Sequence, residues 1–421
     1  MKRGKTDIYV YAHWRGMPGP VFIGVLSAYQ GKGRKSFSFE YDAQWLKGKN
    51  LFLLDPDIGL YSGPQFPGSK ENFGLFLDSM PDTWGKTLMK KRAAQLAKIQ
   101  GKTAPVLHDI DFLLGVADTC RMGALRFKLS ADGPFLDDDR HSPIPPWTSA
   151  GELQHIAGLV ESDRDTRELN KWLIMLMAPG SSLGGARPKA NIVDKNGDLW
   201  IAKFPSKNDT TDKAMWEFLA YKLALKAGIT MSESRIEKVA GNYHTFFTRR
   251  FDTMKGERIH FASAMSMTGN NEDTFRNNRA SYLDLSSFIQ NHVGYIKEDL
   301  IQLWRRIVFH IAVSNTDDHL RNHGFIIEKD AWRLSPAFDV NPSVDKEELA
   351  LNIDDSSGDL DFDLALSVSE YFRLNSKEAQ TIFSEVIKSV STWEKTAKEL
   401  GISKGEIELM RPAFRSEMVR W

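Results

Sequence analysis

Apolar and polar residues alternate in three short runs near the start of the chain. The runs cover residues 8–11, 21–26 and 36–41, and Gly and Pro residues separate them. Such alternation is typical of half-buried strands, so the pattern predicts three strands joined by turns. Leu88, Met89 and Leu96 then recur at helical spacing, which predicts a helix over 84–99. A further strand is predicted at 123–127.

The pattern changes after residue 149. It predicts helices at 149–160 and 212–226, the second ending at Gly228. Strands are predicted at 190–193 and 199–204, joined by the hairpin signal Asp194-Lys195-Asn196-Gly197, and again at 243–250. From about residue 280 the chain is mostly helical, with predicted helices at 300–313, 376–400 and 404–419. The fold class predicted is therefore α+β.

The best candidate for a linker is the segment 131–149, which is rich in Asp, Pro and Gly. A chain of 421 residues is expected to form two or three domains. We expect an N-terminal β-rich subdomain at 1–148, a β-containing small lobe at 149–252 and a helical large lobe at 253–421. A small lobe of this kind followed by a helical lobe resembles the two-lobed layout of protein kinases.

Composition adds little about partners but does indicate a compartment. Lys plus Arg and Asp plus Glu each number 55, so the net charge gives no sign of a polyanionic partner. The single cysteine, Cys120, cannot form an internal disulfide, which fits a reducing cytoplasm. No apolar segment follows the basic residues Met1–Lys5, and no run reaches the ~18 apolar residues of a membrane span. We expect a soluble cytoplasmic protein that does not act at a membrane.

The polar cluster 314–323 follows a strongly apolar stretch and carries the clearest chemistry. Asp317 precedes Asn322 by five residues, and Asp339 follows after a short strand-like run. Phosphoryl transfer from ATP needs a carboxylate to orient the attacking hydroxyl, and an amide and a second carboxylate to hold Mg²⁺. The order and spacing resemble the catalytic loop and metal aspartate of kinases. The alternative, a helix-capping cluster, leaves Asp339 unexplained.

Two further elements fit the same chemistry. The Gly-rich segment Ser181–Lys189 could approach phosphates through its backbone N–H groups, with Arg187 and Lys189 adding positive charge, although a plain turn also explains it. Lys203 lies inside an apolar strand and is expensive to bury without an anionic partner. Glu217 on the next helix is the candidate partner. The alternative is that Lys203 extends to solvent.

Taken in order, these segments resemble the HipA family of bacterial serine/threonine kinase toxins. The resemblance covers nearly the whole chain. It rests on the segments 182–189, 201–204, 250–252, 315–323 and 335–340, and more loosely on Phe76–Asp82 and Gly123-Ala124-Leu125.

The resemblance implies roles for individual residues. Asp317 would be the catalytic aspartate, Asn322 and Asp339 the Mg²⁺ ligands, and Ser182 the site of an inhibitory autophosphorylation. The ATP-binding residues implied are Lys203, Ser182, Gly184, Gly185, Ala186, Arg187, Lys189, Arg249, Phe251 and His319. The implied partners are a DNA-binding antitoxin of the HipB type, through which DNA is reached only indirectly, and a protein substrate such as an aminoacyl-tRNA synthetase.

Two other functions remain open from the residues alone. The same fold could serve a small-molecule kinase, which an acceptor assay separates from a protein kinase. The chain could instead be a nucleic-acid-linked protein, either regulatory or a metal-dependent nuclease using Asp317, Asp318, His319 and Asp339. The absence of a basic stripe in the sequence argues mildly against that reading.

Overall fold

The computed structural model describes residues 4–31, 34–48, 51–68, 70–136, 144–162, 173, 176, 185–270 and 279–416. The chain forms two compact units, each built from two stretches of sequence. Unit 1 comprises Met1–Lys207 and Arg249–Asn271, and unit 2 comprises Asn208–Thr248 and Glu272–Trp421. The three-domain division expected above stays a prediction.

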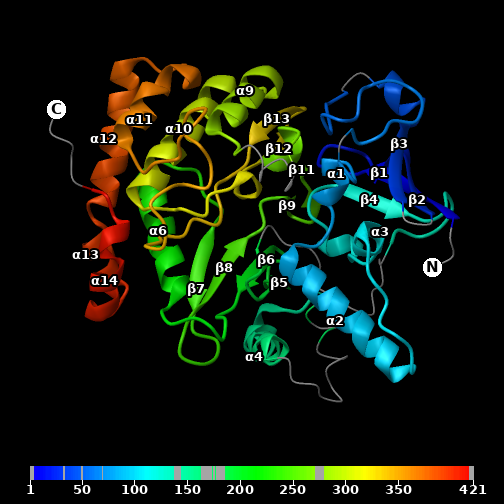
Figure 1. The fold of residues 1–421 in the computed structure, drawn as a ribbon, viewed down its shortest axis with the longest axis horizontal. Coiled ribbons are helices and arrows are strands. Elements are labelled where there is room, and N and C mark those ends of the chain that lie inside the picture. Colours follow the sequence, from blue (N-terminus) through cyan, green and yellow to red (C-terminus); the bar gives the residue numbers. More distant parts are fainter. Residues whose placement is uncertain are drawn as a thin grey trace. The chain divides into compact units, whose positions relative to one another are not determined.

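Unit 1 begins with an antiparallel sheet of strand order β3-β2-β1-β4 (Figure 1). Its strands are β1 (Gly4–Ala12), β2 (Val21–Gly31), β3 (Arg34–Tyr41) and β4 (Leu125–Lys128). Along β1 every second residue is buried, at Ile8, Val10 and Ala12, as expected for a sheet with one face on the core. The four strands predicted in this region are therefore confirmed.

The rest of unit 1 contains further helices and short strands. The helices are α1 (Gly74–Leu77), α2 (Thr83–Ile99), α3 (Asp109–Leu114), α4 (Ala150–Glu161) and α7 (Ala264–Met267). The strands are β5 (Lys189–Val193), β6 (Leu199–Lys203), β9 (Thr253–Met254), β10 (Glu257–Arg258) and β11 (Phe261–Ser263). β5 and β6 form the predicted hairpin, with Val193 opposite Leu199 and Gly197 at a φ of 83° in the turn.

Unit 2 is mainly helical. Its helices are α6 (Lys213–Lys226), α9 (Tyr282–His292), α10 (Ile296–Ala312), α11 (Phe362–Ser367), α12 (Ser376–Val390), α13 (Trp393–Glu399) and α14 (Lys404–Met410). Two antiparallel hairpins accompany them, β7 (Ser234–Glu237) with β8 (Thr245–Arg249) and β12 (Gly324–Glu328) with β13 (Ala331–Leu334). α10 packs against both α9 and α12 (Figure 1). Leu303, Trp304 and Ile307 of α10 are completely buried.

Three predicted features of unit 2 need correction. The helix predicted over 376–400 is two helices, because α12 ends at Val390 and α13 starts at Trp393. The helix predicted over 404–419 ends at Met410, since Pro412 cannot continue an α-helix. The short strand-like run predicted before Asp339 is a hairpin of two strands, β12 and β13, rather than a single run. Among the described helices, none is long and apolar enough to cross a membrane.

Candidate active site

The predicted catalytic stretch follows directly from the buried helix α10. The helix ends at Ala312, and Ser314 adopts a left-handed conformation with a φ of 48°. The backbone N–H of Asn315 then donates to the carbonyl of His310 at 2.9 Å, which closes the helix end. The polar residues of the loop are thereby attached to an extensively buried helix of unit 2.

Two neighbouring aspartates on this loop lie in opposite environments. Asp317 is exposed, whereas Asp318 is 1% exposed. Only the exposed carboxylate can reach a substrate hydroxyl, so the structure makes Asp317 the better candidate for the base, as predicted from its spacing to Asn322. Asp318 must have another role.

Asn322 carries a buried side-chain amide next to the backbone of Asp317. Its Nδ2 donates to the backbone carbonyl of Asp317 at 3.1 Å, which fixes the orientation of the side-chain amide. Its Oδ1 is buried and has no hydrogen-bond partner among the described residues. A buried acceptor without a partner is costly unless a ligand completes it, and an amide oxygen suits Mg²⁺. This observation fits the predicted metal role of Asn322.

Asp339 lies on a second loop that follows hairpin β12–β13. It adopts a left-handed conformation with a φ of 58°, which is unusual for a residue with a side chain. Its Oδ1 accepts a hydrogen bond from Nδ2 of Asn341 at 3.0 Å. Strain of this kind persists where the surroundings hold a functional group in place.

The two loops are joined by hydrogen bonds that the sequence did not reveal. The side-chain Oδ1 of Asn315 accepts from the backbone N–H of Asn341 at 3.1 Å, and the carbonyl of Ser314 accepts from the N–H of Ser343 at 3.1 Å. The loop carrying Asp317 and Asn322 therefore holds its position against the loop carrying Asp339. The signal for Asn315 was its place beside the catalytic candidates, while nothing marked Asn341.

Asp318 is the centre of a buried polar network beneath the loop. Its Oδ2 accepts from Nδ1 of His310 at 2.8 Å, from Nε2 of His323 at 2.7 Å and from the hydroxyl of Tyr282. Burial opposes ionisation of Asp318, but the two imidazoles outweigh it and hold the pKa of the carboxyl well below its usual range. Burial lowers the pKa of His323 and raises that of Tyr282 well above its ordinary value.

The same three side chains, His310, Asp318 and His323, have the composition of a metal site but not its spacing. Ligands on one Zn²⁺ at about 2.0–2.1 Å lie roughly 3.3 Å apart in tetrahedral geometry. The contacts of 2.7 and 2.8 Å to a single oxygen are instead those of hydrogen bonds. Asp318 is therefore committed to the loop's support, which weighs against the nuclease reading that used it as a metal ligand.

Unit 1 carries the residues predicted to bind the nucleotide, except for His319, which belongs to unit 2. Lys203 is the last residue of β6 and is 8% exposed, so it does not extend into solvent. Gly185 and Ala186 are exposed, and Arg187 is half-buried. Ser182 and Gly184 lie outside the described residues. The pairing of Lys203 with Glu217, a buried residue of α6 in unit 2, stays a prediction.

The remaining predicted site residues have other surroundings. Nδ1 of His319 is buried and without a hydrogen-bond partner among the described residues. Arg249 forms an ion pair with Asp198 at 2.8 Å, and the ring of Phe251 lies 5.7 Å from that of Phe261. Lys189 is 4% exposed and pairs with Asp82 at 2.9 Å, a partner that sequence reasoning missed.

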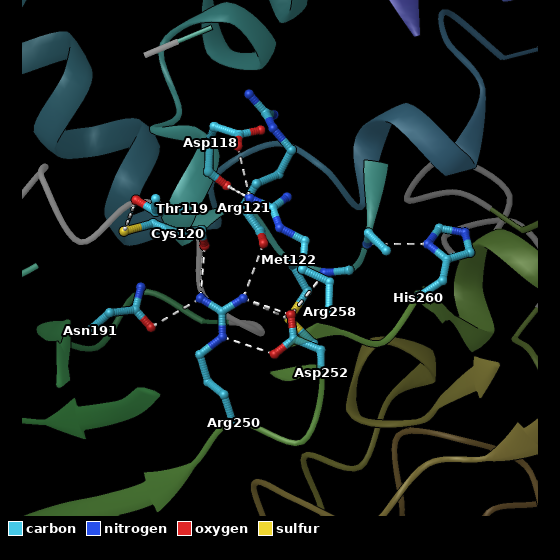
Figure 2. A network of polar contacts seen from close by, with 12 residues as sticks. Asp118, Thr119, Cys120, Arg121, Met122, Asn191, Arg250, Asp252, Arg258 and His260 are labelled. Atoms are coloured by element: carbon cyan, nitrogen blue, oxygen red, sulfur yellow. Dashed lines mark hydrogen bonds and ion pairs between the residues drawn. The ribbon is translucent and has the colours of Figure 1, made fainter. Parts of the chain in front are cut away.

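Arg250, between the two residues predicted to meet the adenine, is a buried structural residue (Figure 2). Its guanidinium donates to the carbonyls of Cys120 and Arg121 at 2.8 and 3.1 Å, and to both carboxylate oxygens of Asp252. Asp252 in turn accepts from the N–H of Gly123 at 2.8 Å. Two segments singled out in the sequence, Arg250–Asp252 and Gly123–Leu125, thus meet in one network within unit 1.

The fold and this loop define a class of protein: an α+β chain of kinase-like fold with an aspartate, an asparagine and a second aspartate on two joined loops. Residues 181–393, about half of the chain, match the family model described as HipA-like C-terminal domain. The chain belongs to the HipA family.

A solved structure agrees with this assignment at the level of the fold. HipA of Shewanella oneidensis MR-1, solved with HipB and operator DNA, superimposes with a TM-score of 0.64. The match covers 96% of this chain and 94% of that chain at 16% identity, so the likeness extends to the N-terminal part. The predicted α+β fold of the kinase-like type, with an N-terminal β-rich part, is confirmed. The Helicobacter pylori kinase CtkA gives a TM-score of only 0.34 over 52% of this chain and 94% of that chain, at 15% identity.

A further relative aligns with a smaller part of this chain. A Haemophilus influenzae protein named "Putative kinase" is 24% identical over 179 residues. The alignment covers 38% of this chain and 52% of that protein, so the chain spans about half the length of the relative.

Proposed function

We propose that this chain is an ATP- and Mg²⁺-dependent protein kinase that phosphorylates serine or threonine. The observation that carries the proposal is the buried Oδ1 of Asn322, which has no hydrogen-bond partner within the described part of the chain. It lies beside exposed Asp317, on a loop that is hydrogen-bonded to the loop of Asp339. Family membership and the kinase-like fold support it, as does the name of the Haemophilus influenzae relative.

The residues of unit 2 would divide the work of phosphoryl transfer. Asp317 would accept a hydrogen bond from the attacking hydroxyl and receive its proton as the bond to phosphorus forms. Asn322 and Asp339 would hold Mg²⁺, which neutralises charge on the phosphates when bound. The Asp318 network would keep Asp317 in position without touching substrate.

The residues of unit 1 would bind the nucleotide. Lys203 is assigned to the α- and β-phosphates, and Gly184, Gly185, Ala186 and Arg187 to a loop over the phosphates. Arg249 and Phe251 are assigned to the adenine side, and His319 of unit 2 to the neighbourhood of the nucleotide. Ser182 would accept a phosphate, whose roughly −1.5 to −2 charge would repel the triphosphate and switch the kinase off.

Mass spectrometry tests this proposal directly. Purified wild-type protein incubated with Mg²⁺ and ATP is expected to gain one phosphate, located on Ser182 by peptide mapping, while Asp317→Gln gains none. Asp330→Asn is the matched control, because Asp330 is an exposed turn residue with a φ of 63° that Asn adopts readily. Phosphate on another residue would contradict the proposed regulation through Ser182. If no protein gained phosphate, the assignment of kinase activity would be contradicted.

Loss of the carboxylate assigned to the metal should be equally informative. Asp339→Asn is expected to lower turnover at least about a hundredfold, because a Mg²⁺ ligand that stabilises transition-state charge is lost. Circular dichroism and thermal unfolding should match the wild type, since Asn keeps the left-handed backbone and an acceptor for Asn341. Turnover within a factor of two of the wild type would exclude the metal role.

We further propose that the kinase is a cytoplasmic toxin restrained by a HipB-type DNA-binding antitoxin. The solved Shewanella oneidensis HipA is bound to HipB and operator DNA, which supports a similar partner here and contact with DNA through it. Its substrate would be a protein of translation, such as an aminoacyl-tRNA synthetase. Expression of the chain alone should arrest growth, and Asp317→Gln should not. Phosphoproteomics of the two cultures identifies the substrate, and unimpaired growth at high expression would contradict the toxin assignment.

A further inference from the structure

The start of helix α2 has a shape that directs one carboxylate out of the helix. Asp82 is the N-cap, and its Oδ1 accepts from the N–H of Gly85 at 2.8 Å. A Cβ on Gly85 would lie 2.6 Å from Cβ of Pro81, so the tight turn requires glycine here. The second oxygen of Asp82 remains available for another segment. This turn is the end of the Phe76–Asp82 motif, to which the proposed function assigns nothing.

That oxygen meets the described end of the Gly-rich segment. Oδ2 of Asp82 pairs with Nζ of Lys189 at 2.9 Å, and the two side chains are 5% and 3% exposed. Trp84, two residues further, donates from Nε1 to the carbonyl of Lys189 at 3.0 Å and from its backbone N–H to the carbonyl of Gly185 at 3.3 Å. We call Asp82, Trp84 and Lys189 the loop anchor.

The loop anchor holds both ends of one short segment. Gly185 and Lys189 are its first and last residues, and Nζ of Lys189 also approaches the carbonyl of Gly185 at 3.4 Å. Gly185 has a φ of +95°, which a residue with a side chain rarely adopts. The segment is therefore a turn closed by contacts at its two ends. These contacts hold its exposed residues, Gly185 and Ala186, in place.

The ion pair within the loop anchor limits which ligands Lys189 can bind. Asp82 and Lys189 form an ion pair in a buried place, and loss of such a pair is costly. Lys189 could reach a phosphate only by giving up this ion pair. On the same strand, Asn191 lies within 3.4 Å of the Arg250 guanidinium, so β5 is held at a second point (Figure 2).

We propose that Asp82 and Trp84 are positioning residues for the phosphate-binding segment, and that Lys189 is their attachment point rather than a phosphate ligand. The inference rests on the proposed function, because it assumes that Gly185–Arg187 face the nucleotide phosphates. Its consequence is that α2 influences nucleotide affinity through its contacts with the ends of this segment, although Asp82 and Trp84 would not touch ATP themselves.

The test uses the full chain, with titration calorimetry of the non-hydrolysable analogue AMP-PNP and Mg²⁺, and with KM and kcat for ATP. The variants are Asp82→Asn, which keeps an N-cap, Lys189→Gln, Trp84→Phe, and the double variant Asp82→Asn/Lys189→Gln. Each single variant is expected to raise Kd and KM roughly tenfold while kcat changes less than about threefold. The double variant restores a neutral hydrogen-bonded pair and should return Kd to within about threefold of the wild type.

The controls separate this inference from a merely structural role and from the proposed function. Asp361→Asn, at the exposed N-cap of α11, should leave KM unchanged. Single variants with a lower Tm but wild-type Kd and KM would overturn the positioning role. A double variant as weak as Lys189→Gln would make Lys189 a phosphate ligand after all. A wild-type chain that binds no AMP-PNP would overturn the proposed function itself, and Trp84→Phe keeps the test open if a charge variant fails to fold.

Discussion

Asp318 shows how one buried carboxylate can support an exposed neighbour. Three donors converge on its Oδ2, so substitution by Asn removes the charge and cannot satisfy all of them. We expect Asp318→Asn to lower the free energy of unfolding by about 3 kcal/mol, from the loss of charged hydrogen bonds in a buried place. Urea unfolding measures it, with Asp330→Asn as the control of the same chemistry at an exposed turn. Equal stability of Asp318→Asn and the wild type would mean that the network is not needed.

A second prediction at the scale of single residues concerns Arg250. Its planar guanidinium donates to two backbone carbonyls and to both oxygens of Asp252, which an ammonium cannot reproduce. Arg250→Lys is therefore expected to destabilise the chain by about 2–4 kcal/mol although the charge is kept. Denaturant unfolding provides the measurement. Arg249→Lys, at a half-buried residue with one ion pair, should cost less than about 1 kcal/mol.

The candidate site residues stand out in the sequence where they lie close together along the chain. Asp317, Asn322 and Asp339 keep a spacing set by one loop and one hairpin, and the structure puts them on two joined loops. The partners Asp82 and Lys189 are 107 residues apart, and Tyr282 and Asp318 are 36 apart. No period or motif connects such pairs, because only tertiary packing brings them together.

At the scale of elements, the join between the two catalytic loops is the feature most open to test. Asn315→Ala removes the acceptor for the N–H of Asn341, so the loop of Asp339 should shift relative to Asn322. We expect turnover to fall at least about tenfold and the free energy of unfolding to fall by about 1–2 kcal/mol. Kinase assays and urea unfolding on the same preparation measure both.

Asn375→Ala is the matched control for that prediction. Asn375 caps α12 with a reciprocal hydrogen bond to Glu378, away from the two loops. Its loss should cost about 1 kcal/mol of stability with unchanged turnover. If Asn315→Ala likewise lowered stability and left turnover unchanged, the hydrogen bonds between the two loops would have no role in catalysis.

Elements themselves were predictable where their period was long or their turn chemistry explicit. The helix at 84–99 and the hairpin around Asn196-Gly197 are confirmed as α2 and β5–β6. The break between α12 and α13 was missed, because Ser391 and Thr392 interrupt the helix without a Gly or Pro to mark it. The strand-like run before Asp339 was predicted as one segment, and its division into β12 and β13 was missed because the turn at Lys329 and Asp330 contains no Gly or Pro to mark it.

For the molecule as a whole, buried carboxylates set a dependence of stability on pH. Burial raises the pKa of Asp55 to about 6 from an ordinary value of 3.8. The folded chain therefore binds this proton more tightly than the unfolded chain, so the contribution is full below about pH 4 and is lost as pH rises through 6. Between pH 4.5 and 7 the loss amounts to about 2 kcal/mol.

Asp55→Asn should remove that dependence. The difference in unfolding free energy between variant and wild type is expected to move in the variant's favour by about 2 kcal/mol as pH rises from 4.5 to 7. Urea unfolding at three pH values gives the difference, in which the other titrating groups cancel. A difference that does not vary with pH would show that Asp55 titrates normally.

Because the two units alternate along the sequence, they also affect how the chain folds during its synthesis. The first 207 residues cannot complete their own unit, because Arg250 and Asp252 are made only after the segment Asn208–Thr248 of the other. At 5–20 residues per second a ribosome needs roughly 2–9 s to add the 45 residues from 207 to 252. During that interval the backbone carbonyls of Cys120 and Arg121 lack their guanidinium donor. A nascent chain released in this window should be a preferred client of chaperones and proteases.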